Sequence, residues 1–203
     1  MIDLVEKQDL AQYHRRCHFD YASYLDWLDE DEISSDYHVV STANIQIRDR
    51  SEWNTLGREI HDVERLRTHA QEVCKIVRSL GVKTFVAQHE YLPGIWFPEH
   101  LISEKSVADK ISYIRSKVGS IDISRFDGGF RIEDEICDFV GVFIDYPFLK
   151  DRWHYKDIDI ISMERDLIIK INHHLSIQFV TSSRDAAEEI LGLCGETDII
   201  SID

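Results

Sequence analysis

Two aspartates in the run WHYKDIDI are the residues best placed for acid–base or metal chemistry. A strand over this run would put Asp157 and Asp159 on one face and Ile158 on the other. Two carboxylates on one face can hold Mg²⁺ or divide the roles of general acid and general base. The full set of catalytic candidates adds neighbouring polar residues: Asp145, His154, Asp157, Asp159 and Lys170.

Asp166 and Lys170 come from the next run, DLIIK, and an even separation places both on one strand face. A metal-dependent nuclease that uses an acid and a nearby lysine would need the shorter spacing D/E-x-K. The alternative to a catalytic site is the water-facing side of an antiparallel sheet, which normally carries such polar residues.

Histidines and a cysteine near the N-terminus are the candidates for a metal site. On a helix, His14 and His18 stand one turn apart with Cys17 close by, which suits zinc if further ligands are supplied. His38 and His61 are the only suggestions for those ligands, and a polar helix face is the competing interpretation. The adjacent pair His173-His174 points to opposite sides of a strand and favours a hairpin turn.

Several catalytic and cofactor motifs are missing from the sequence. It contains no GxGxxG or GxxxxGK[ST] phosphate loop, no GxSxG nucleophile turn, no HExxH helix and no EF-hand spacing. We therefore expect no cofactor and no enzyme of these classes.

The segment YLDWLDEDEISSDY, from Tyr24 to Tyr37, contains six acids and no base. Its acids and the aromatics of two later loops suit a basic protein surface, since Trp and Tyr are over-represented at binding hot spots. The same aromatics can instead belong to the core, and the acids can serve solubility alone. The candidate partner-binding residues are Trp27, Asp29, Glu30, Asp31, Glu32, Asp36, Trp96, Trp153 and Tyr155.

The charge of the chain is large and uneven. The 203 residues carry a formal net charge of −15. Residues 1–37 hold ten acids against three bases, and residues 121–203 hold eighteen acids against eight bases. Binding to nucleic acid phosphates needs a cationic face, so free nucleic acid is an unfavourable partner. A basic protein is the better match.

Cysteines and hydropathy bear on the compartment. The four cysteines are scattered without a CxxC pair, as in proteins whose thiols stay reduced. The longest apolar runs, such as FVGVFI, are far short of the roughly 20 residues of a membrane-spanning helix. With no signal peptide visible, we expect a cytoplasmic protein without a membrane partner.

Apolar spacing predicts the elements that must position these residues. Helical periodicity covers residues 6–29 in two pieces, 51–80 between Ser51 and Gly81, 106–118, and a stretch capped by Ser182 or Ser183. Alternation or short β-rich runs predict strands at 39–47, 82–88, 136–145, 157–162, 166–171, 175–181 and 197–202.

These elements favour an α+β fold. The strand–long helix–strand unit at 39–88 suggests parallel pairing through a right-handed crossover, and the later strands suggest an antiparallel meander followed by a C-terminal helix. Together they predict helices packed on one mixed sheet. We expect one domain over 1–203, with 119–129 as the best candidate boundary.

Three classes of function remain open. The first is an acidic binding module, such as an immunity or inhibitor protein that covers a basic partner. The second is a small metal-dependent hydrolase or nuclease-like enzyme that uses the strand carboxylates. The third is a homo-oligomeric structural protein that pairs through its long helix.

Overall fold

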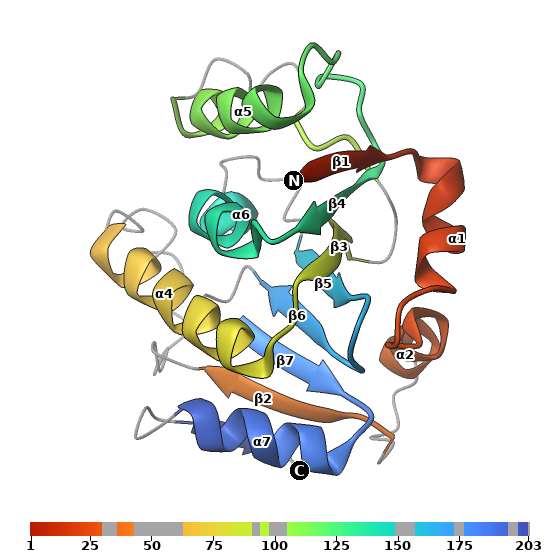
Figure 1. Cartoon of the computed structure of the whole chain (residues 1–203), viewed down its shortest axis with the longest axis vertical. Coiled ribbons are helices and arrows are strands. Elements are labelled where there is room, and N and C mark those ends of the chain that lie inside the picture. Colours follow the sequence, from red (N-terminus) through yellow and green to blue (C-terminus); the bar gives the residue numbers. More distant parts are fainter. Residues whose placement is uncertain are drawn as a thin grey trace.

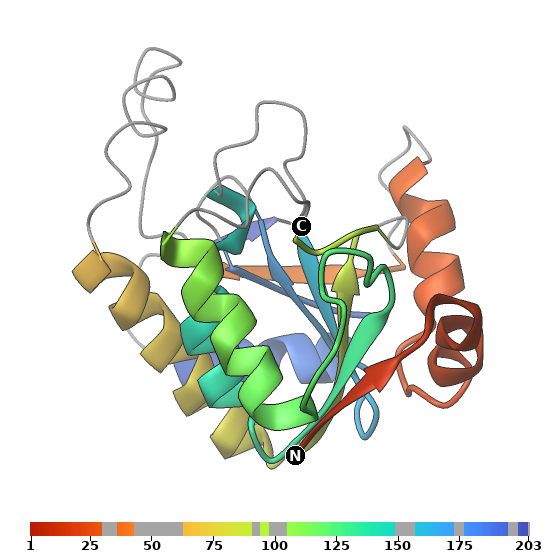
Figure 2. The same ribbon diagram turned by 90° about the horizontal axis from the view of Figure 1, so that it is seen from above.

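In the computed structural model, helices cover both faces of one antiparallel sheet (Figures 1 and 2). The structure describes residues 1–29, 36–42, 63–90, 94–97, 105–148, 157–172, 177–194 and 199–202. The strands are β1 (Ile2–Val5), β2 (His38–Thr42), β3 (Thr84–His89), β4 (Gly129–Glu133), β5 (Ile158–Ser162), β6 (Ile168–Ile171), β7 (Ile177–Thr181) and β8 (Ile199–Ile202). Their order is β1-β4-β3-β5-β6-β7-β2-β8.

The helices form two unequal layers around this sheet (Figure 2). One layer contains α4 (Val63–Leu80), α5 (Lys105–Val118), α6 (Ile136–Phe143) and α7 (Arg184–Cys194). The other contains α1 (Leu10–His14) and α2 (Tyr21–Asp29). Short 3₁₀ turns lie at Lys7–Asp9 and Tyr146–Phe148. None of the helices in the described ranges is long and apolar enough to cross a membrane.

The main apolar core lies between the sheet and the four-helix layer. Phe85, Ile160, Ile169 and Phe179 from the central strands point into it. Alternate residues of the same strands, such as Ile161 and Val180, pack in a separate cluster beneath α2. The strands are apolar on both faces because both faces are covered. A polar side chain in the middle of such a strand is therefore buried and needs a partner.

Most predicted elements are confirmed where the chain is described, whereas residues 43–47 of the first predicted strand and 51–62 of the long predicted helix lie outside the described residues. The fold is α+β, and β5, β6 and β7 form the expected antiparallel meander. Gly81 and Gly119 end α4 and α5 with φ of 69° and 81°, left-handed values that glycine adopts without a steric penalty. Ser183 caps α7, since its Oγ accepts a hydrogen bond from the Ala186 N–H at 3.3 Å.

The predicted parallel pairing of the first two long strands is wrong. Every neighbouring pair in the sheet is antiparallel, so β2 and β3 do run in the same direction. They are not neighbours, because β5, β6 and β7 lie between them. The meander of β5, β6 and β7 separates the two strands that the crossover joins. The sheet is therefore antiparallel and not mixed as predicted.

The strand predicted at 136–145 is also wrong. These residues form α6, whose buried side chains are Ile136, Phe139, Val140 and Phe143. Their spacing of three, four and seven residues is that of one helix face, and the β-branched and aromatic composition hid it. The strands β1 and β4 were not predicted, because each is a short run at or near a sheet edge.

The contact of β1 with Gly128 gives a test of this edge of the sheet. A Cβ on Gly128 would run into the Val5 carbonyl oxygen, so Gly128→Ala should lower the free energy of unfolding by about 3 kcal/mol. Gly141 lies exposed on α6 with open space around it. Gly141→Ala should therefore raise the free energy by about 0.5–1 kcal/mol. Urea denaturation of both variants measures the difference, and equal effects would contradict the β1–β4 contact.

Candidate functional site

A row of polar residues crosses the middle of the sheet on the face covered by α1 and α2. Strand register places Gln88 opposite Asp159, Asp159 opposite Lys170, and Lys170 opposite Gln178. Directly opposed residues of antiparallel strands share a face, so these side chains form one line across β3, β5, β6 and β7. The row brings together the sequence candidates Asp159 and Lys170.

The helix α2 is fixed over this row by its own N-terminus. Asp20 caps α2, because its carboxylate accepts hydrogen bonds from the Ser23 N–H at 3.2 Å and the Ser23 hydroxyl at 2.9 Å. Tyr21 and Tyr24 then lie three residues apart on the buried face of the helix. Each presents its hydroxyl to the polar row.

Seven residues from α1, α2 and the sheet form what we call the polar cluster. Tyr21 donates to Asp159 Oδ2 at 2.7 Å, and Lys170 Nζ donates to the Tyr24 hydroxyl at 3.0 Å. Lys170 Nζ also makes a close ion pair with Glu90, which follows the end of β3. The members are His14, Tyr21, Tyr24, Gln88, Glu90, Asp159 and Lys170.

Lys170 carries its positive charge in the interior. Burial alone would lower its pKa, but Asp159, Tyr24 and Glu90 more than offset that effect and hold the pKa above its usual value. The side chain is only 8% exposed, so water contributes little to its solvation. The ammonium therefore stays charged and depends on its protein partners.

Asp159 is the carboxylate in excess within the cluster. It is fully buried, and burial raises its pKa to about 7, with Lys170 opposing the rise and Glu90 adding to it. Glu90 already pairs with Lys170, whereas Asp159 Oδ1 lies 3.9 Å from Nζ and accepts no hydrogen bond within the described part of the chain. When Asp159 is protonated, the positive charge of Lys170 is balanced by the negative charge of Glu90 alone.

The predicted metal candidate His14 belongs to the polar cluster instead. Its Nε2 lies 2.7 Å from Gln88 Oε1 and donates to it, since a carbonyl oxygen only accepts. Burial lowers the pKa of His14, which favours the neutral imidazole. Burial also raises the pKa of Cys17 to about 11, so this thiol keeps its proton. His18 is exposed to solvent.

Two further observations concern the metal prediction. The described ranges contain no group of three or more His, Cys, Asp and Glu side chains positioned to hold a metal ion. His38 begins β2, whereas His61 and the His173-His174 pair lie outside the described residues.

The remaining catalytic candidates are only partly brought together. Asp157 is buried beside the cluster, and its charge contributes to the pKa of Asp159. Asp145 follows α6 on the opposite side of the sheet and pairs with Lys110 at 2.5 Å, so it does not join Asp157 and Asp159. His154 lies outside the described residues.

The solvated sheet face that competed with a catalytic site is also wrong. Asp159 and Lys170 are both buried, because α2 covers them. Asp166 lies outside the strand that contains Lys170. It lies in the turn before β6 and accepts hydrogen bonds from Thr181 and Ser182.

A second group of acids lies on the surface beside α2. Burial and then the charges of four aspartates raise the pKa of Tyr37 to about 12. We call these four residues the acidic patch: Asp20, Asp26, Asp36 and Asp166. The first three are exposed. Asp20, Asp26 and Asp166 form no ion pair with another residue of the described ranges.

Two aromatic side chains border the acidic patch. Trp27 and Tyr37 are half-buried, with ring centroids 5.3 Å apart, and both pack on the buried Tyr24. The predicted partner-binding residues Trp27 and Asp36 therefore lie at this surface. The Asp29 side chain and Glu30, Asp31 and Glu32 lie outside the described residues.

The other predicted interface aromatics are not found at this surface. Trp96 is 0% exposed and donates its indole N–H to the Gly128 carbonyl oxygen at 3.0 Å, which makes it a core residue. It packs against His89 and Tyr146 in the main core. Trp153 and Tyr155 lie outside the described residues.

Sequence reasoning missed four members of the polar cluster: Tyr21, Tyr24, Gln88 and Glu90. Tyr21 and Tyr24 were assigned to the apolar face of a helix, which is correct for their rings but ignores their hydroxyls. A buried tyrosine hydroxyl nearly always finds a polar partner. The charged residues inside the runs IDIIS and IIKI were the available signal for that partner.

Comparison of the chain with protein families, with curated proteins and with solved structures gave no significant match. The geometry and charge of the polar cluster and of the acidic patch are therefore the basis for the proposal that follows.

The raised pKa of Asp159 predicts a pH-dependent stability difference. Between pH 3.8 and about 7 the folded protein binds more protons at Asp159 than the unfolded chain, so wild-type stability should fall as the pH rises through this window. Asp159→Asn removes this titration. The stability of Asp159→Asn relative to wild type should rise by on the order of 1 kcal/mol per pH unit and level off above pH 7. Urea denaturation across the window measures it, and a constant difference would contradict the assignment.

Removal of the ammonium tests whether the cluster acts as a unit. Lys170→Met leaves the half-buried Glu90 and the buried Asp159 without their counter-ion and should cost about 3–5 kcal/mol of stability. The same substitution should cost less in the Asp159→Asn background, because one of the two orphaned charges is then absent. A double-mutant cycle by urea denaturation at pH 8 gives the coupling, and strict additivity would show that Lys170 and Asp159 act separately.

Proposed function

We propose that this protein binds a basic protein partner through the acidic patch and the adjoining rings of Trp27 and Tyr37. The observation that carries the proposal is the group of four aspartates whose charges act on the Tyr37 hydroxyl. Like charges repel one another, so a surface that gathers them gains most from a partner that brings cations.

The position of the aromatic rings supports this proposal. Trp27 and Tyr37 rest on the buried Tyr24 and on each other, which restricts their motion. Rigid aromatic groups bordered by charge are common at the energetic centres of protein interfaces. The sequence between α2 and Tyr37 adds Glu30, Asp31 and Glu32 to the negative charge of this part of the chain.

Two of the four patch residues also stabilise the fold through hydrogen bonds. Asp20 caps α2, and Asp166 holds the turn after β7 through Ser182. Asp26 and Asp36 are both exposed at the surface of the patch. These two residues are consequently the ones to neutralise when binding is to be separated from folding.

An inhibitor or immunity-type protein that covers a basic enzyme is the concrete form of this proposal. It fits an excess of fifteen negative charges on 203 residues. The four thiols, none of them in a disulfide, agree with the cytoplasm as the expected compartment.

A carboxylate-based enzyme is the second candidate, and one observation favours it. Asp159 and Lys170 face each other with strongly perturbed ionisation, a property that catalytic groups often share. The hydrogen bonds to Tyr21 and Tyr24 equally suit a structural role, in which the cluster fastens α1 and α2 to the sheet. Divalent-dependent thermal stabilisation that is lost in Asp159→Asn would favour the enzyme.

Neutralisation of the patch provides the decisive comparison. Asp26→Asn combined with Asp36→Asn should weaken capture of a basic partner from a lysate of the native host by roughly 5–30-fold, the effect of about one to two kcal/mol. Captured proteins are identified and quantified by mass spectrometry at low and at high salt. Screening should reduce capture by the wild type at high salt.

A control with the same change in net charge separates the patch from overall charge. Asp109 and Asp185 are exposed on α5 and α7, on the other side of the sheet. Asp109→Asn combined with Asp185→Asn should leave capture unchanged. Equal losses in both double variants would reduce the effect to bulk charge, and unchanged capture in both would refute a role for the patch.

A further inference from the structure

A pair of cysteines lies between two helices on the side of the sheet away from the acidic patch. Cys74 belongs to α4 and Cys137 to α6, and these helices run beside each other over the sheet (Figure 1). The Cys137 thiol lies close enough to the Cys74 thiol to raise its pKa. The two residues are 63 positions apart in the sequence, so no local motif announces the pair.

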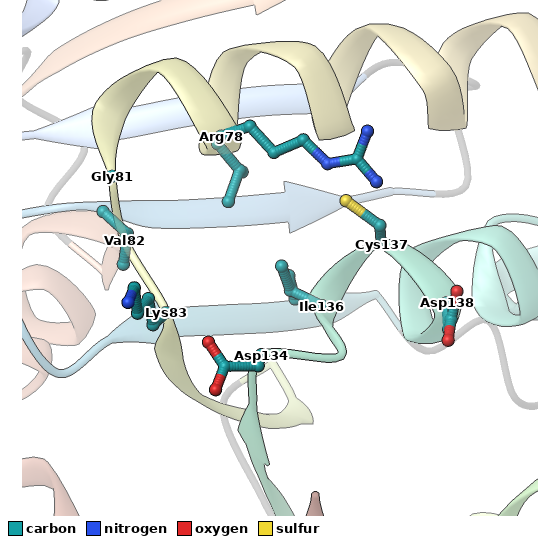
Figure 3. Close-up of a pocket in the computed structure, with 9 residues that line it drawn as sticks. Arg78, Gly81, Val82, Lys83, Asp134, Ile136, Cys137 and Asp138 are labelled. Carbon is teal, nitrogen blue, oxygen red and sulfur yellow. The ribbon is translucent and has the colours of Figure 1, made fainter.

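The two thiols differ in their access to solvent molecules. Cys137 lines a cavity of about 280 Å³ together with Val77, Arg78, Lys83 and Asp134. Figure 3 shows the Cys137 sulfur pointing toward α4, on the side of the cavity where Arg78 lies. Cys74 is half-buried and is not among the residues that line this cavity. A reagent entering the cavity therefore meets Cys137 first.

The raised pKa of Cys74 also favours reaction at Cys137 before Cys74. Burial, the hydrogen bond to Cys137 and the charge of Cys137 raise the pKa of Cys74 to about 12, and Arg78 opposes the rise. A thiol that keeps its proton is a poor first nucleophile. Cys74 can still attack a disulfide that has already formed on its neighbour, because the two sulfurs are then held together.

We infer that Cys137 and Cys74 form a redox-active dithiol that small-molecule disulfides such as oxidised glutathione convert to a disulfide between α4 and α6. The Cys137 thiolate attacks one sulfur of oxidised glutathione, the S–S bond breaks, and one glutathione leaves as a thiol after taking a proton. Cys74 then loses its proton to water and attacks the Cys137 sulfur, which displaces the second glutathione. Two protein thiols are oxidised, and one glutathione disulfide is reduced to two thiols.

The other two cysteines provide matched controls within the same chain. Cys17 packs near α1 on the opposite face of the sheet, and burial raises its pKa to about 11. Cys194 ends α7, and burial and then Glu72 raise its pKa. Both are half-buried, as Cys74 and Cys137 are, so exposure alone does not single out the pair.

The test is incubation of the folded full-length protein with oxidised glutathione, followed by denaturation, alkylation and mass spectrometry. The wild type should lose two alkylatable thiols, give a peptide linking Cys74 to Cys137, and retain no glutathione. Cys74→Ser should stop at the mixed disulfide on Cys137. Cys137→Ser should react at Cys74 at least about tenfold more slowly than the wild type reacts. Cys17→Ser and Cys194→Ser should behave as the wild type.

Three results would overturn the inference. They are the absence of the Cys74–Cys137 peptide from the wild type, faster reaction at Cys17 or Cys194 than at Cys137, and stable glutathione on wild-type Cys137. Circular dichroism shows whether each serine variant is folded, and the wild-type peptide decides the question if one of them is not. The oxidised wild type should also melt at a higher Tm than the reduced form, with no such shift in Cys74→Ser or Cys137→Ser.

Discussion

The buried charge of Lys170 is the constraint on which the arrangement around α1 and α2 depends. An ammonium in the middle of a covered sheet is stable only if carboxylates and hydroxyls surround it. Register provides Asp159 on the neighbouring strand, the end of β3 provides Glu90, and α2 provides the Tyr24 hydroxyl. The helix must therefore lie where its tyrosines reach the sheet, and the cap at Asp20 sets the start of that helix.

This requirement makes the two faces of the sheet different in kind. On one face, the four helices pack on the sheet through a continuous apolar core. Apolar contacts are not directional, so this packing tolerates small shifts of the helices. The α1–α2 face combines smaller apolar clusters with directed hydrogen bonds through Tyr21, Tyr24 and His14. Directed bonds fix the orientation of α2. A fixed α2 in turn holds Trp27 and Asp26 in a constant relation to Tyr37, which a binding surface needs.

Sequence patterns predicted the elements well and their assembly less well. Period and caps were sufficient for α5, α7 and the meander, since those signals are local. The position of β2 beside β7 was not predictable from the unit that contains it, because later strands decide which neighbours are available. The helix α6 was misassigned because Ile136, Val140 and Phe143 have strand-like composition although their spacing is helical.

The candidate site shows the same division between local and non-local information. Asp159 and Lys170 were found from residue type and parity within a strand, and register then made them direct neighbours. Tyr21 and Tyr24 come from a helix more than 130 residues away in sequence, so only the tertiary fold could connect them. The cysteine pair is a further example, since neither thiol lies in a recognisable motif.

The acidic patch and the cysteine pair lie on opposite sides of the sheet. A disulfide between α4 and α6 would tighten the apolar layer, whereas Tyr37 and its aspartates rest on the layer held by polar contacts. Oxidation should therefore leave the acidic patch unchanged.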